Sequence, residues 1–319
     1  MDPGLLEQIV KKISQEYNAS QIHLYSWGEP FLHPQLAKMV AIAQSSGAQC
    51  FLSSNLNITH NIKEVLNSNP YCLRVSVSGF TQPVYSRNHI GGDIEMVKDN
   101  LTQLSAVIRT KRLQTQIHIY YLRFKYNLHE EKAMHAFARK LGIGFHPVWA
   151  LFIPIEKVLS FADPNSGETD LSESDRQVIK NLALPLDKAL EVCRNYPLTC
   201  PMRDGLITLD ILGNVLLCCS VYDNSRFTIA PFLSSRPEDL RMLKVKHPFC
   251  SQCMKHGIHT YETRGAWECD EIAAQNIDPE FAKSLSFRWE RVKKTIYYKI
   301  IPNELRQQAY DLYARLVKF

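Results

Sequence analysis

The first 150 residues switch repeatedly between two hydrophobic periods. Apolar residues three and four positions apart predict helices over residues 4–17, 34–46, 60–68, 92–110 and 129–141. Alternating or continuously apolar runs predict strands over residues 21–27, 48–54, 72–78, 116–124 and 145–152. Gly47 and Gly142 follow two of the helices and are typical helix ends. Strands that alternate with helices predict an α/β fold with a parallel sheet and right-handed crossovers.

The predicted order begins with a helix, whereas a sheet or barrel of this kind normally begins with a strand. We therefore expect a first strand and its loop to be missing from this sequence. The sequence is polar over residues 161–177, as expected of a connection between domains, and then becomes rich in cysteine. These changes predict three parts, namely a partial barrel with its connection over 1–185, a small Cys-rich domain over 186–275 and a basic helical tail over 276–319.

The composition indicates a globular protein, because 45% of the 319 residues are hydrophobic and 22% are charged. The sequence contains no run of about 18 apolar residues and no secretory signal, so we expect a cytoplasmic protein without a membrane span. The net charge of +5 comes from residues 281–319, where nine Lys and Arg face three acids. A solvated helical face explains such a run better than RNA, an anionic membrane or an acidic partner, and we do not expect nucleic acid.

Nine cysteines are many for a cytoplasmic chain, and their odd number argues against a disulfide framework. Cys250 and Cys253 form a CxxC pair, and Cys200 and Cys218 flank the turn at Gly213. Four thiolates arranged in this way predict a metal cage that suits either Zn or a 4Fe-4S cluster. Cys219 follows Cys218 on a predicted strand, so we expect only Cys218 to face the cage.

Polar residues also gather where the predicted strands end. The sequence Trp27-Gly28-Glu29-Pro30 follows the first strand, Ser53-Ser54-Asn55 follows the second, and Ser76 and Ser78-Gly79 lie in and after the third. Ligands of parallel α/β folds bind at the carboxyl ends of the strands. Gly28 allows close approach of the backbone, Pro30 fixes the turn, and Glu29 offers an acceptor for an ammonium group. The pattern indicates a site for a polar small molecule.

These motifs resemble those of the radical S-adenosylmethionine (SAM) enzymes. WGEP over 27–30 is similar to their GGEP motif, SSN over 53–55 to the strand-end motif that follows it, and residues 75–92 to the stretch read as VSIDG with a later Tyr and Arg. Cys200, Gly213 and Cys218, followed by CxxC, resemble the first part of the SPASM domain, an auxiliary iron-sulfur module. The resemblance covers about residues 1–270 and leaves the tail out.

The resemblance implies a partial (β/α)6 barrel, here without its first strand, that holds SAM across the strand ends. Residues 27–30 would contact the methionyl amino group, Ser54 and Asn55 would lie near SAM, and Ser76 would lie near its ribose. Arg87 would help to bind the carboxylate, with a salt bridge at a helix start as its alternative role. In its intact form such an enzyme modifies a peptide, sugar or other small molecule through a 5′-deoxyadenosyl radical. Its electrons would come from a donor such as flavodoxin or ferredoxin.

Three departures from the family pattern qualify this interpretation. The CxxxCxxC loop that binds the SAM-cleaving cluster is absent, since no cysteine precedes Cys50, and we do not expect the chain as written to cleave SAM. Trp27 replaces the first Gly of GGEP, and Ser78 replaces the Asp of VSIDG. The cysteines after Cys253 are too few for two auxiliary clusters, so we expect one at most.

Two alternatives belong to other functional classes. The first is a non-catalytic barrel that keeps the metal module to bind a partner, in which the metal serves stability alone. The second is a Zn-stapled α/β protein, unrelated to SAM, whose basic tail holds nucleic acid. Iron and sulfide content would separate the first interpretation from the last, because a Zn site contains neither.

Overall fold

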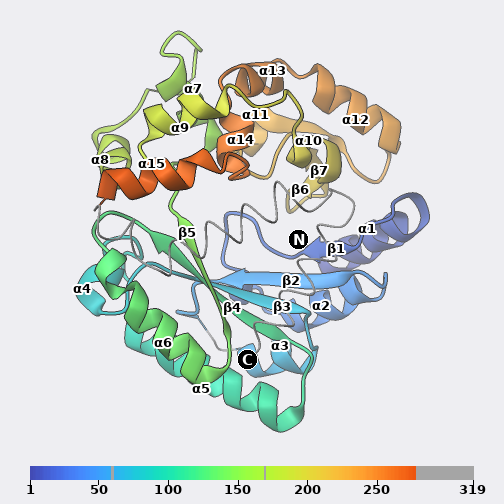
Figure 1. Ribbon diagram of the computed structural model, residues 1–319. Coiled ribbons are helices and arrows are strands. Elements are labelled where there is room, and N and C mark those ends of the chain that lie inside the picture. Colours follow the sequence, from blue (N-terminus) through green and yellow to red (C-terminus); the bar gives the residue numbers. More distant parts are fainter. Residues whose placement is uncertain (59–60, 169, 278–319) are drawn as a thin grey trace. The chain divides into compact units, whose positions relative to one another are not determined.

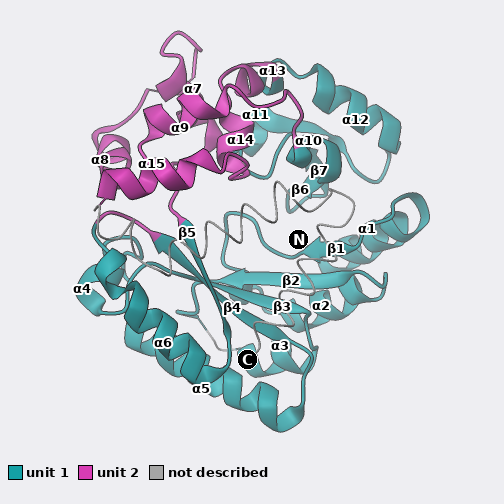
Figure 2. Ribbon diagram, in the orientation of Figure 1, with its two compact units in different colours: residues 1–122, 126–148, 201–250 teal, residues 123–125, 149–200, 251–319 magenta. Residues whose placement is uncertain are grey.

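The computed structural model describes residues 1–58, 61–168 and 170–277. The chain divides into two compact units, each assembled from separate stretches of sequence (Figure 2). The first unit contains residues 1–122, 126–148 and 201–250, and the second contains 123–125, 149–200 and the residues from 251 onward. The division of the sequence near 185 and 275 stays a prediction, and the basic tail over 278–319 lies outside the described residues.

A five-stranded sheet forms the centre of the first unit, and its strands follow one another in chain order (Figure 1). They are β1 (Gln21–His23), β2 (Gln49–Ser54), β3 (Cys72–Val77), β4 (Gln116–Arg123) and β5 (Gly144–Trp149). The first four pair in parallel, with Phe51 beside Cys72 and Val75 beside Ile119. The predicted α/β class and partial barrel are confirmed. The first strand is shorter than the predicted 21–27, because the chain leaves the sheet after His23.

Helices cover one face of this sheet. They are α2 (Leu36–Gln44), α3 (Ile62–Asn67), the short α4 (Gln82–Tyr85), α5 (Ile94–Lys111) and α6 (Glu131–Leu141), with 3-10 turns η1 (Pro30–Leu32) and η2 (Leu128–Glu130). Every second strand residue enters the core with them, as in the set Leu52, Val75, Ile119, Val40, Leu101 and Met134. Full burial of each such side chain contributes about 1.5–3 kcal/mol. The core therefore fixes which face of each strand points away from the helices.

Two residues, Asp93 and Gly142, set the ends of two of these helices. The Asp93 carboxylate accepts hydrogen bonds from the backbone N–H groups of Glu95 and Met96 and thereby caps α5. Gly142 ends α6 with a φ of 68°, a left-handed conformation that favours glycine. The predicted stop at Gly142 is confirmed, since α6 ends one residue before it.

Helix α1 (Pro3–Glu16) has two buried faces. Leu6 and Val10 pack on Met39 of α2, whereas Ile9 packs on Val215 and Phe232. A second, antiparallel sheet consists of β6 (Thr208–Leu209), β7 (Asn214–Leu216) and β8 (Thr228–Pro231). Val215 lies in β7, and Phe232 directly follows β8. The short helices α10 (Pro201–Gly205) and α11 (Asn224–Phe227) and the longer α12 (Pro237–Lys246) adjoin this sheet in the sequence. Helix α1 thus joins the large sheet's helical layer to the small sheet.

The second unit is mainly helical. It contains α7 (Ile155–Ala162), α8 (Glu173–Asn181), α9 (Leu186–Cys193), α14 (Ile258–Glu262) and α15 (Glu268–Ile277), while α13 (Pro248–Lys255) crosses the boundary between the units. Helix α9 packs on α14 and α15. The Trp149 indole N–H donates to the Asp270 carboxylate over 2.6 Å, and the Tyr261 hydroxyl accepts from the Phe152 backbone N–H over 2.8 Å. These buried bonds tie the exit of β5 to α14 and α15.

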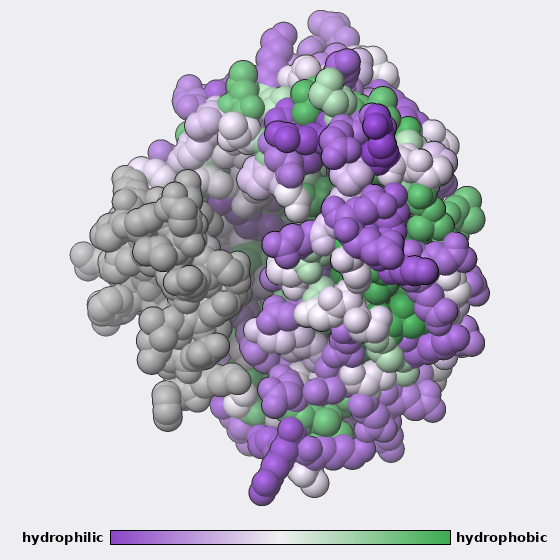
Figure 3. Space-filling model, turned by 90° about the vertical axis from the view of Figure 1, so that its right-hand side faces the viewer, coloured by the Kyte–Doolittle hydropathy of each residue, from purple (hydrophilic) through white to green (hydrophobic). Residues whose placement is uncertain are grey.

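Within the described residues, no helix is both long and apolar enough to cross a membrane. Hydrophilic and hydrophobic side chains are interspersed on the face drawn in Figure 3. The turn between β6 and β7 exposes two large apolar residues, Ile211 and Leu212.

Candidate cofactor site at the strand ends

The segment after β1 carries the WGEP sequence, and Glu29 organises it. Its Oε1 accepts a hydrogen bond from the Phe31 backbone N–H over 3.1 Å, which caps η1. Its Oε2 accepts from the Asn55 backbone N–H over 2.9 Å. One carboxylate therefore joins the segment after β1 to the segment after β2. Each oxygen keeps a further lone pair with which to accept from a ligand.

Gly28 lies exposed in the same segment. A Cβ added at Gly28 would meet nothing within 4 Å, so the local packing does not require a glycine at this position. The backbone at Gly28 thus borders open space beside the Glu29 carboxylate. Pro30 is buried and starts η1, as the sequence predicted for the turn. An exposed backbone therefore stands next to a carboxylate acceptor at the end of β1.

The segment after β2 is folded by its own side chains. The Ser54 hydroxyl accepts from the Leu56 N–H over 2.9 Å, and the Asn55 side-chain oxygen accepts from the Asn57 N–H over 2.9 Å. The Asn57 amide then donates to the Tyr85 hydroxyl over 2.8 Å. Ser54 and Asn55 therefore shape the loop through local bonds, and Asn57 links it to the segment after β3.

The segment after β3 contains the predicted Ser76, Ser78 and Gly79. Ser76 is half-buried and points to the face opposite the helices, where it pairs with Tyr120 across the ladder. Ser78 is fully buried, and its hydroxyl has no hydrogen-bond partner among the described residues. A Cβ at Gly79 would lie 2.5 Å from the Tyr85 backbone nitrogen, so this position requires glycine. The VSIDG-like stretch thus turns tightly into α4.

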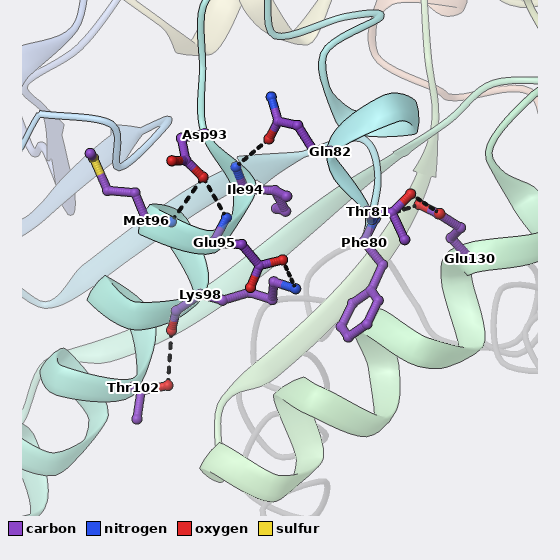
Figure 4. A network of polar contacts seen from close by, with 10 residues as sticks. All are labelled: Phe80, Thr81, Gln82, Asp93, Ile94, Glu95, Met96, Lys98, Thr102 and Glu130. Atoms are coloured by element: carbon purple, nitrogen blue, oxygen red, sulfur yellow. Dashed lines mark hydrogen bonds and ion pairs between the residues drawn. The ribbon is translucent and has the colours of Figure 1, made fainter.

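The Glu130 carboxylate stabilises this turn through hydrogen bonds to Phe80 and Thr81 (Figure 4). Its carboxylate accepts from the backbone N–H groups of Phe80, over 2.6 Å, and Thr81, over 3.1 Å, and from the Thr81 hydroxyl. Burial alone raises the pKa of Glu130, but these hydrogen bonds outweigh it and hold the pKa below its usual value. In the same network, the Gln82 side-chain oxygen accepts from the Ile94 N–H at the start of α5.

Arg87 is exposed, and its guanidinium lies over the Tyr126 ring at 5.0 Å from the centroid. Burial raises the pKa of Tyr126 to about 12, against the lowering effect of Arg87. The neighbouring Asn127 donates to the backbone oxygens of Ser78 and Leu122. It stands at the N-cap position of η2, but its side chain makes no capping bond there. Backbone carbonyls at the ends of two strands take its donors instead.

The predicted metal ligands are divided between the two units. Cys218 and Cys250 belong to the first unit, and Cys200 and Cys253 belong to the second. Cys250 and Cys253 lie one turn apart on α13. Among the described residues, no three His, Cys, Asp or Glu side chains are arranged to hold a metal ion. The four-sulfur cage therefore stays a prediction.

The Cys218 and Cys219 side chains differ from the expected alternation. Strand β7 ends at Leu216, and both thiols lie against the Met202 sulfur, at 3.8 and 3.6 Å. Strand alternation does not extend to these two residues, and the expectation that only Cys218 faces the metal cage stays a prediction. The result is a local cluster of soft sulfur atoms within the first unit.

A polar layer on the sheet was missed in the sequence. The face opposite the helices carries an inner-face layer, which we define as His23, Tyr25, Phe51, Arg74, His118, Tyr120 and His146. His118 Nδ1 lies 2.7 Å from His146 Nε2, and Gly144 leaves the room that the His118 ring needs. The alternating polar residues in 21–25 and 116–120 were the available signal. We interpreted them only as evidence for strands.

Comparisons with known proteins agree with the fold. No protein-family model and no curated protein matches the sequence. SuiB of Streptococcus suis is similar in structure, with a TM-score of 0.51, 10% identity and coverage of 82% of this chain. This chain spans 62% of the length of SuiB. A weaker similarity is to SuiB bound to S-adenosylmethionine, with a TM-score of 0.49, 11% identity and coverage of 81% of this chain and 64% of SuiB. Another is to native anSMEcpe with bound AdoMet, with a TM-score of 0.47, 12% identity and coverage of 89% of each chain. Because the sequence identity is only 10%, the similarity to SuiB shows the fold, a partial radical-SAM-type barrel, and nothing about activity.

Proposed function

We propose that the first unit binds S-adenosylmethionine across the ends of β1, β2 and β3, as a member of the radical SAM/SPASM proteins. The observation that carries this proposal is the Glu29 carboxylate, which joins the WGEP segment to Asn55 over 2.9 Å. Two motifs separated in the sequence thus meet at one edge of a parallel sheet, where ligands of such folds bind. The SuiB-like fold supports the same interpretation.

Each predicted residue receives a role from its surroundings. The Gly28 backbone approaches the ligand, and the remaining lone pairs of Glu29 accept from the methionyl ammonium group. Pro30, Ser54 and Asn55 keep the two loops in shape through the turn and the local hydrogen bonds described above. Ser76 offers its hydroxyl from β3 to the ribose, and Arg87 neutralises the carboxylate from the edge of the site.

The cysteines at 200, 218, 250 and 253 are proposed to hold one auxiliary 4Fe-4S cluster, with Zn as the alternative metal. Thiolates suit both, and the soft sulfur cluster around Met202 agrees with that donor set. A 4Fe-4S cluster would supply electron transfer when bound, whereas Zn, which has no redox chemistry, would serve structure alone. The chain's own residues orient SAM and the substrate.

In its intact form, we propose, the protein modifies a peptide, sugar or small molecule in the cytoplasm, with electrons from a flavodoxin or ferredoxin. The residues of the CxxxCxxC motif are not in this sequence. A non-catalytic barrel that binds a partner is the competing proposal. It expects weak SAM binding or none, and metal retained only for stability.

Equilibrium dialysis with labelled SAM tests the binding site. We expect the wild type to bind and Gly28→Val to weaken binding at least tenfold, because the valine fills the open space beside Glu29. Gly205→Val is the matched control, since a Cβ at Gly205 also meets nothing within 4 Å. It should change the affinity by less than twofold. Equal binding by wild type and Gly28→Val, or none by either, would overturn the proposal.

Metal analysis of protein purified without oxygen separates the cofactors. A cluster gives about four irons with matching sulfide per chain, and a structural site gives one Zn. Cys218→Ser should lower whichever metal is bound, whereas Cys50→Ser should not, because Cys50 is buried in the core of the sheet. Equal metal content in all three proteins would remove Cys218 from the ligand set.

A further inference from the structure

Trp27 is the residue at which the WGEP segment departs from the GGEP pattern of the radical SAM enzymes. Its indole N–H donates to the Val221 backbone oxygen over 2.8 Å, across 194 positions of the sequence. Its ring also meets the Tyr222 ring nearly at a right angle, with the two centroids 5.5 Å apart. All three residues belong to the first unit. A glycine at position 27 has no side chain to make either contact, so Trp27 adds a connection between the end of β1 and a distant segment.

The partners of Trp27 belong to the cysteine loop, which we define as residues 217–222, between β7 and α11. The first residue of this loop donates a backbone hydrogen bond to the Phe227 oxygen over 2.9 Å. Val221, which receives the indole bond, is itself 1% exposed and therefore anchored in the core. The loop also carries Cys218, one of the predicted metal ligands. The Trp27 bond thus joins the proposed SAM site to the cysteine loop.

Gly28 lies between two anchored side chains. On one side the Trp27 indole is bonded to Val221, and on the other the Glu29 carboxylate accepts from the Asn55 backbone N–H. Glycine has more backbone freedom than any other residue, and ordering it when a ligand binds costs free energy. Two anchored neighbours remove part of that freedom before the ligand arrives. The contacts of Trp27 and Glu29 therefore pre-organise the Gly28 backbone.

We propose that Trp27 is a positioning residue, which holds the Gly28 backbone in place for SAM and couples SAM affinity to the order of the cysteine loop. The inference rests on the proposed function, since it concerns the same ligand. Trp27 acts through Gly28 and not by contact with SAM. Such coupling is reciprocal, so SAM stabilises the ordered loop by the same factor by which the ordered loop improves SAM binding.

Equilibrium dialysis with labelled SAM measures one direction of this coupling. Trp27→Phe keeps an aromatic ring beside Tyr222 but loses the N–H donor, and should weaken SAM binding at least fivefold. The matched control is Gln44→Met, because the Gln44 amide also donates to a backbone oxygen, that of Asn69, over 2.8 Å. That bond precedes β2 and β3 in the chain, at the strand ends opposite to the proposed site. The control should change the affinity by less than twofold.

The outcomes of the dialysis separate the two proposals. Wild-type affinity in the folded Trp27→Phe variant would overturn this inference and leave the proposed function standing. No binding by the wild type would overturn the proposed function and this inference together. Urea unfolding of both variants verifies that each is folded under the conditions of the dialysis.

Hydrogen–deuterium exchange followed by mass spectrometry measures the other direction. The backbone amides of the cysteine loop should exchange at least threefold faster in Trp27→Phe than in the wild type without SAM. SAM at a concentration that saturates both proteins should slow this exchange at least twofold in the wild type and leave it unchanged in Trp27→Phe. A merely structural bond would alter the first comparison but not the second. Equal slowing by SAM in both proteins, or none in either, would overturn the inference.

Discussion

Gly79 and Gly28 are chemically identical residues in the strand-end segments, yet their surroundings differ. At Gly79 the backbone of Tyr85 and Val84 lies within 3.0 Å of the place where a Cβ would sit. At Gly28 that place is empty to 4 Å. The fold therefore requires glycine at position 79, whereas the backbone at Gly28 has open space beside it. At the scale of single residues, this contrast distinguishes a structural glycine from a candidate ligand contact.

Gly79→Ala should destabilise the first unit by about 1–3 kcal/mol, because backbone atoms cannot move aside as a flexible side chain would. Gly28→Ala should change the free energy of unfolding by less than about 0.5 kcal/mol. Urea unfolding followed by circular dichroism measures both. Similar losses in the two variants would show that the close approach of Tyr85 to Gly79 is not rigid.

The same scale shows how far the sequence leads to the site. WGEP and SSN were identified from their residues and their places after strands. Their connection through Glu29 and Asn55 was not, because it depends on how two loops meet in space. Asn127 stands at the N-cap position of η2, where its residue type favours a capping bond, but the backbone oxygens of Ser78 and Leu122 take its amide instead. Tertiary hydrogen bonds overrode local preference there.

At the scale of elements, periodicity predicted most of the first unit. All five strands and the helices α2, α3, α5 and α6 were expected, because alternate residues such as Leu52 and Val75 enter one core; the short α4 was not. Periodicity gave less at the ends of elements, and β1 stops at His23 rather than at residue 27. It also did not reveal that α1 buries two faces, since the small sheet it contacts comes from residues more than 190 positions away.

Helix α1 should contribute to stability through both of its faces. Ile9→Ala removes a side chain that is 1% exposed and packs on Val215 and Phe232. We expect a loss of about 2–4 kcal/mol, since the cavity adds to the lost burial. The matched control is Ile90→Ala, because Ile90 is 92% exposed. It should cost less than about 0.5 kcal/mol in the same urea titration.

Equal stability of Ile9→Ala and Ile90→Ala would mean that the small sheet does not pack on α1 in solution. That outcome would also separate Cys218 from the large sheet's helical layer, since Cys218 follows β7 directly in the chain. The packing of α1 therefore bears on the proposed metal module, because Cys218 lies between β7 and β8 and Cys250 follows β8 in the sequence.

At the scale of the whole molecule, buried histidines couple stability to pH. Burial lowers the pKa of His23, His89 and His146 to about 4, and Arg74 adds to the effect at His23 and His146. The ordinary value, near 6.5, applies in the unfolded chain. Between these two values the unfolded state binds more protons than the folded state. Stability is therefore complete above about pH 6.5 and declines as the pH falls toward 4.

We expect the free energy of unfolding to fall by more than about 1.4 kcal/mol per pH unit near pH 5, since each such histidine contributes up to that slope. Urea titrations at pH 7.0, 6.0 and 5.0 measure it. His146→Gln removes one titrating group and should make the slope shallower by about 1.4 kcal/mol per unit. An unchanged slope in that variant would mean that His146 is protonated in the folded protein near pH 5.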